Sequence, residues 1–170
     1  MIIAISCNKQ KNSVNTNEDT GTTVNLIAPS GLKIASSIAD LKALIDPTVK
    51  IKLGNGNYTI SQVDYVDSKT GYGALIYLKT DSGKLTTVFI ANGIKFKAKV
   101  NNSLAINDTN PLFKTMSDGS GDGGSQTYYC AGPPCCLVGY YFDTNGEVII
   151  DCGCDAYCQI TQGPPPPPVL

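Results

Sequence analysis

Cysteine thiols are the first side chains in this sequence whose number and spacing could do chemistry. Six of the seven cysteines crowd into one segment near the C-terminal end. They are Cys130, Cys135, Cys136, Cys152, Cys154 and Cys158. Thiols grouped in this way form disulfides, hold a zinc ion or an iron–sulfur cluster, or serve as a redox-active dithiol.

Spacing helps to separate these three chemistries. Cys152, Cys154 and Cys158 do not have the C-x-x-C spacing of zinc knuckles, and no C-x-x-C redox pair is present. Clustered cysteines in a short chain are typical of an oxidising compartment. We therefore predict three disulfides, with the connectivity left open. Cys135 and Cys136 should bond to different partners, because a disulfide between neighbouring residues is strained.

The side chains that most enzymes need are missing. The sequence contains no His, no Trp and no Arg, so that all 13 basic residues are Lys. Without His, a Ser-His-Asp or Cys-His nucleophile is excluded, as is a mixed Cys/His zinc site. Without Arg there is no bidentate grip on a carboxylate or phosphate, and a net charge of −1 gives no basis for binding nucleic acid. We predict a protein that is not an enzyme, with no catalytic residues, no cofactor and no metal site.

The N-terminal residues suggest how the protein is anchored. A short apolar run ends in Ala4-Ile5-Ser6-Cys7 and resembles the lipobox of bacterial lipoproteins. This resemblance implies export and lipidation of Cys7, and it places the protein in the cell envelope, lipid-anchored or extracellular. Residues 8–21 are polar and predict a flexible tether. The alternative is that residues 2–5 form a first strand and that Cys7 is a free thiol.

Residues 22–100 have the patterns of a folded α+β domain. Ser37 predicts a helix start, an apolar face follows at helical spacing, and Pro47 predicts the helix end. Strands are predicted over residues 22–28, 49–53, 58–66 with a bulge near Gln62, 74–78 as a central covered strand, 85–91 and 94–100. We therefore predict one helix packed on an antiparallel meander of about four or five strands.

Three lysines alternate with apolar residues in the last of these strands. Lys95, Lys97 and Lys99 form either a basic stripe for an anionic partner or the solvated face of an edge strand. We favour the edge strand, because Lys discourages edge-to-edge pairing and no Arg or aromatic residue joins the stripe.

Residues 101–127 are rich in Gly, Ser and Asp and predict a linker. Asp118, Ser120, Asp122 and Gly123 match the first positions of a calcium loop. The position of the bidentate Glu, however, holds Tyr129. We therefore favour a metal-free linker.

Residues 128–162 are predicted to form a small disulfide-rich β-hairpin module. Two apolar runs, 137–142 and 148–150, flank a turn at Asn145-Gly146, and the cysteines lie where they would close the open end of the hairpin. Its tyrosines form either a binding face for a partner or a small core. They are Tyr128, Tyr129, Tyr140, Tyr141 and Tyr157. Residues 163–170 form a polyproline tail.

Together these features predict a non-catalytic exported lipoprotein that acts in adhesion, scaffolding or partner binding. The partner would be a protein or carbohydrate at the cell surface, or another copy of the chain. No nucleic acid is expected, and the membrane would be contacted only through the lipid anchor. One alternative is a self-assembling subunit of an extracellular fibre. The other is a thiol- or metal-dependent redox protein.

Overall fold

A computed structural model describes residues 24–66, 71–100, 103–106, 125–154 and 157–164. The described chain contains one helix, α1 (Ile38–Leu53). Its strands are β1 (Tyr58–Val66), β2 (Tyr72–Thr80), β3 (Leu85–Asn92), β4 (Lys97–Val100), β5 (Ser103–Ile106), β6 (Gln126–Ala131), β7 (Leu137–Phe142), β8 (Val148–Gly153) and β9 (Gln159–Gln162).

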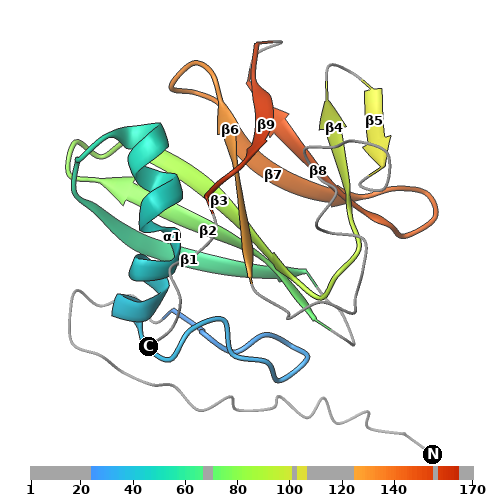
Figure 1. Cartoon of the computed structure of the whole chain (residues 1–170), viewed down its shortest axis with the longest axis horizontal. Helices are drawn as coiled ribbons and strands as arrows, with labels where there is room; N and C mark the ends of the chain where they lie inside the picture. Colours follow the sequence, from blue (N-terminus) through green and yellow to red (C-terminus); the bar gives the residue numbers. More distant parts are fainter. Residues whose placement is uncertain (1–23, 67–70, 101–102, 107–124, 155–156, 165–170) are drawn as a thin grey trace, which may run out of the picture.

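These elements stack in three layers (Figure 1). The central layer is a five-stranded antiparallel sheet with the order β1-β2-β3-β6-β9. Helix α1 covers one face, and a four-stranded sheet with the order β5-β4-β8-β7 covers the other. The predicted fold class is confirmed: a helix lies on an antiparallel sheet, and a disulfide-rich β-hairpin follows near the C-terminal end.

Helix α1 begins where the sequence predicts and ends later. The Ser37 hydroxyl accepts a hydrogen bond from the Asp40 backbone N–H at 3.1 Å, which caps the helix. The predicted end at Pro47 is wrong, since the helix continues to Leu53, and the strand predicted over residues 49–53 is therefore helical. Pro47 removes one backbone hydrogen bond, but the next turn is held by tertiary contacts. Thr48 is fully buried, and its hydroxyl lies 2.6 Å from that of Thr127.

The prediction of a strand over residues 22–28 is also wrong for residues 24–28, the part of it that the structure describes. Residues 24–28 contain only an isolated bridge from Ile27 to Lys33. The turn that begins at Pro29 folds the chain back at once, and the Ala28 N–H donates to the Leu32 carbonyl at 2.9 Å. This pairing is too short to build a strand.

The meander of β1, β2 and β3 agrees with the prediction in detail. Strand β1 has its register shift between Ile60 and Gln62, where the change in alternation predicts a bulge. In β2, Ile76 belongs to the apolar cluster beneath α1, whereas Leu75 belongs to the cluster beneath the second sheet. Both faces of β2 are thus covered, which explains its unbroken apolar run.

The lysine-bearing strand is shorter than predicted and is not an edge. Strand β4 starts at Lys97 and lies between β5 and β8, with β8 running parallel to it. Lys97 pairs with Glu147 and lies 3.8 Å from Asp143, and Lys99 lies 3.2 Å from Asp151. Of the three lysines, Lys95 alone is exposed and makes no ion pair with an acidic side chain in the part of the chain that the structure describes. Carboxylates of the β7–β8 hairpin therefore neutralise two of the three lysines.

The β7–β8 hairpin forms as predicted, with Gly146 at φ +77° and the Asp143 carboxylate accepting from the N–H groups of Asn145 and Glu147. The cysteine-rich segment is not a separate body, however. Strand β6 pairs with β3, and the Tyr128 ring packs edge-on against Phe96 with 5.3 Å between ring centroids. Residues on both sides of the predicted boundary thus share one core.

Strand β9 is followed by a tightly packed glycine, Gly163. The Gly163 N–H donates to the Thr127 carbonyl at 2.8 Å. A Cβ atom at Gly163 would lie 2.0 Å from the Thr48 hydroxyl and 2.4 Å from that of Thr127. Only glycine allows the chain to pass this close to α1.

Candidate functional site: the disulfide tip

Three disulfides close one end of the molecule. Cys130 bonds to Cys152, Cys135 to Cys154 and Cys136 to Cys158, with Cα–Cα separations of 5.7, 5.9 and 5.5 Å. The prediction of three disulfides is confirmed, and the neighbouring cysteines do bond to different partners. All six sulfurs are thereby removed from any thiolate metal site.

Two connections meet at this end, one between β6 and β7 and the other between β8 and β9. The name disulfide tip is used below for residues 132–136, 153, 154, 157 and 158. Gly132 adopts φ +122°, and an added Cβ there would lie 2.9 Å from the Tyr157 carbonyl oxygen and 3.0 Å from the Cys136 sulfur. The two connections therefore touch, and a glycine is needed at the point of contact.

Burial differs among the three disulfides. Cys130 and Cys136 are 1% and 0% exposed and belong to the core between the two sheets, and their partners Cys152 and Cys158 pack against that core. Cys135 and Cys154 are both exposed. Two disulfides are thus part of the packed interior, and the third lies on the surface of the tip.

Lys52 ties helix α1 to the disulfide tip. Its ammonium donates to the Cys130 carbonyl oxygen at 3.1 Å and also to the Cys136 carbonyl oxygen. Burial lowers the pKa of Lys52 to about 8, and repulsion from Lys84 adds to the effect. No sequence signal points to this contact, because its partners are 78 and 84 residues away along the chain.

The five tyrosines predicted as a binding face do not form one. Tyr128 and Tyr129 are 0% and 7% exposed, so their assignment as binding residues is corrected: they are core residues in this structure. Tyr140 is half-buried and packs against Phe89, with 6.4 Å between ring centroids. Only Tyr141 and Tyr157, 43% and 78% exposed, are open to a partner.

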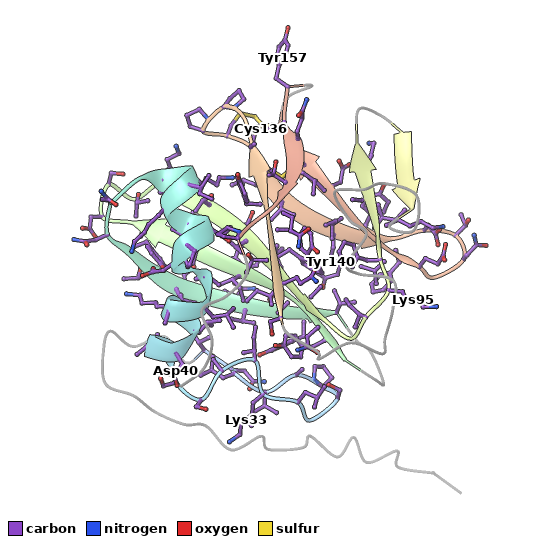
Figure 2. The ribbon with its side chains drawn as sticks, in the orientation of Figure 1. Lys33, Asp40, Lys95, Cys136, Tyr140 and Tyr157 are labelled. Atoms are coloured by element: carbon purple, nitrogen blue, oxygen red, sulfur yellow. A yellow bond between two sulfur atoms is a disulfide. The ribbon has the colours of Figure 1, made fainter. Side chains whose placement is uncertain are left out.

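The two exposed tyrosines lie at different ends of the hairpin. Strand β7 leads from the tip to the hairpin turn over six residues, which corresponds to about 20 Å. Tyr141 lies near the turn, whereas Tyr157 belongs to the tip. Figure 2 shows Tyr157 projecting away from the body of the molecule, above Cys136, and Tyr140 inside it. Alternation along the sequence could not reveal this separation, because it depends on which strands pair.

Several predicted features lie outside the described residues. They are the lipidation residue Cys7 with its tether, the calcium-like run from Asp118 to Asp122, and the prolines from residue 165 onward. Within the ranges that the structure describes, no group of three or more Cys, Asp or Glu side chains is arranged to hold a metal ion.

No protein-family model, curated protein or solved structure matches this chain. The three disulfides indicate an oxidising environment, extracellular or in the cell envelope. Among the described residues, no helix has the length and apolar character needed to cross a membrane.

Proposed function

We propose that this chain is a non-catalytic recognition protein of a bacterial envelope, anchored by a lipid on Cys7, whose disulfide tip binds a protein partner. The observation that carries the proposal is the exposed Tyr157 ring, held next to Cys158 on a covalently closed loop. The lipobox-like run supports the lipid anchor, and the disulfides support a location outside the reducing cytoplasm.

An exposed tyrosine between two disulfide-bonded cysteines is well suited to binding. Tyrosine supplies a large contact area with few rotatable bonds, and it is enriched among the residues that contribute most to protein interfaces. The loop that carries Tyr157 is fixed on one side by Cys136–Cys158 and on the other by Cys135–Cys154. Because both ends of the loop are covalently restrained before binding, less conformational entropy is lost when a partner binds.

The shape of the tip favours a protein over a carbohydrate. Tyr157 projects from the end of the molecule (Figure 2). Concave pockets are the usual binding sites for small ligands. A projecting aromatic side chain, by contrast, fits into a pocket on a partner, as the central residues of protein interfaces do.

The test is binding of the purified, fluorescently labelled full chain to intact cells of its own source, measured by flow cytometry. We expect Tyr157→Ser to weaken binding by about 30-fold, the loss expected for a central interface residue. Treating the cells with protease should abolish binding, whereas treating them with glycosidases should not.

Tyr141→Ser is the matched control, because Tyr141 is an exposed tyrosine at the other end of the hairpin. It should bind as the unmodified chain does. Equal affinity of the Tyr157→Ser variant and the unmodified chain would refute the proposal. Binding that survives protease and is lost with glycosidases would assign the tip to a carbohydrate.

Self-assembly is a second candidate function, and a different surface favours it. Strand β7 is the outer strand of the four-stranded sheet in the described chain, and it ends at Phe142, which is 53% exposed. An outer strand with exposed aromatic residues can pair with the same strand of another copy. Light scattering of the purified chain would reveal such assemblies, and Phe142→Lys should disperse them.

A further inference from the structure

The three disulfides are not equivalent, and the difference bears on their chemistry. In Cys130–Cys152 and Cys136–Cys158, one cysteine is almost fully buried and the other is half-buried, so a reagent in solution reaches their sulfurs less easily than those of an exposed pair. Cys135 and Cys154 are both exposed. Access to a sulfur atom is one of the main determinants of the rate of thiol–disulfide exchange.

A second observation points to the same bond. Cys154 adopts φ +110°, and it is the one non-glycine residue with positive φ in the part of the chain that the structure describes. A residue with a side chain is strained in this region, at a cost of about 1–3 kcal/mol that the surrounding structure must sustain. Breaking the bond to Cys135 would release the constraint that holds Cys154 in this conformation.

We infer that Cys135–Cys154 is a thiol-exchange site, which small thiols or the dithiol of a reductase open while the other two disulfides stay closed. A thiolate attacks one sulfur of the pair and forms a mixed disulfide with it, and the other sulfur leaves as a thiolate that takes up a proton. The second thiol of the dithiol then attacks the dithiol's own sulfur in this mixed disulfide, and the protein sulfur leaves as a thiolate that takes up a proton. The dithiol departs as an intramolecular disulfide. The protein gains two hydrogens and the dithiol loses two.

The fold around the opened bond should remain in place. Cys130–Cys152 still joins β6 to β8, and Cys136–Cys158 still joins the two connections of the tip. Cys135 is adjacent to Cys136 in the chain, so its thiol stays close to Cys154 after reduction. The bond can therefore form again, which makes the exchange reversible. Exchange does not require the tip to bind a partner.

Differential alkylation of the native full chain tests this inference. Free thiols are first blocked with N-ethylmaleimide, dithiothreitol or glutathione is added at increasing concentration without denaturant, and new thiols are trapped with iodoacetamide. Peptide mass spectrometry then gives the rate at each cysteine. We expect Cys135 and Cys154 to react at least about 10-fold faster than the other four, and glutathione to be found attached to one of this pair.

Simultaneous reduction of all three disulfides would overturn the inference, as would earlier reduction of a buried pair or no reduction before the protein unfolds. The matched control is the double variant Cys135→Ser with Cys154→Ser, which should release no thiol under conditions that reduce the unmodified chain. If this variant fails to fold, the order of labelling in the unmodified chain still decides between the outcomes.

Discussion

The two faces of the central sheet are covered in different ways. On one face, α1 packs against the sheet through a mainly aliphatic cluster, which includes Leu41, Ile45 and Ile76 but no cystine sulfur. On the other face, the cluster combines aromatic rings with Cys130 and Cys136. The helix layer is held by packing and hydrogen bonds without a disulfide, whereas the other layer is held by packing and disulfides.

Strand length accounts for this difference. Helix α1 has 16 residues and presents an apolar stripe that covers the sheet without covalent help. In the second sheet, β4 and β5 have four residues each and β7 and β8 six each, and β4 is in register with β8 at only two positions. Strands this short pair weakly by themselves. The Cys130–Cys152 disulfide joins this layer to the central sheet, because Cys130 lies in β6 and Cys152 in β8.

The largest expected effect is on the helix face. Ile45 is fully buried on the side of α1 that faces the sheet, and Ile45→Ala should lower the free energy of unfolding by about 2–5 kcal/mol, because it leaves a cavity. Urea denaturation measures the change. Because Ile45 lies on the face without disulfides, the loss should be the same in oxidised and fully reduced protein, within about 0.5 kcal/mol. If the loss vanished on reduction, the contributions of the two faces to the free energy of unfolding would not be independent.

A somewhat smaller effect is expected from the buried disulfide. The double variant Cys130→Ala with Cys152→Ala should lower the free energy of unfolding by about 2–3 kcal/mol, near the lower end of the usual range for a disulfide. Cys135–Cys154 already closes most of the loop that Cys130–Cys152 closes. In the unfolded chain, Cys130–Cys152 therefore adds a restriction only on residues 130–135 and 152–154. Urea denaturation of oxidised protein checks this value. A loss above about 5 kcal/mol would mean that the second sheet does not fold without this bond.

The smallest effect concerns Lys52, which connects the two regions. Its folded-state pKa of about 8 lies below the ordinary lysine pKa of 10.5, because the ammonium is partly buried. Between these values the unfolded chain binds more protons, so stability should rise as the pH increases from 8 toward 10. Relative to Lys52→Met, the unmodified chain should gain about 1 kcal/mol over this range, since solvent still reaches part of the ammonium.

Urea denaturation at pH 7, 8, 9 and 10, with free thiols blocked, measures this dependence. Lys50→Met is the control, because Lys50 lies in the same helical turn but is exposed. A pH dependence that persisted in Lys52→Met would assign the effect to other groups. Burial raises the pKa of several tyrosines in the folded chain, so above pH 10 these groups make stability fall as the pH increases. The comparison therefore ends at pH 10.

Local signals in the sequence predicted a large part of this structure. Ser37 marked the helix start, the phase change near Gln62 marked the bulge, and Asn145-Gly146 marked the hairpin turn. Each of these features depends on residues a few positions apart, so the sequence contains all the information needed. The grouping of six cysteines likewise predicted three disulfides.

The errors arose where distant contacts outweigh local preference. Pro47 predicts a helix end, yet contacts of Thr48 with Thr127 keep the next turn helical. The alternating lysines predict an edge strand, yet β4 is an inner strand because β8 and β5 flank it. Tyr129 is a candidate for either a binding face or a small core on sequence alone, and the pairing of β6 with β9 accompanies its burial.

The sequence by itself thus determined which cysteines form disulfides, where the helix starts and where the hairpin turns, because each depends on nearby residues. Tertiary structure alone decided which cysteine bonds to which, which of the disulfides is exposed, and which tyrosine projects. Those outcomes depend on how β6, β7, β8 and β9 are placed over the central sheet, and that placement is fixed by packing between residues far apart in the chain.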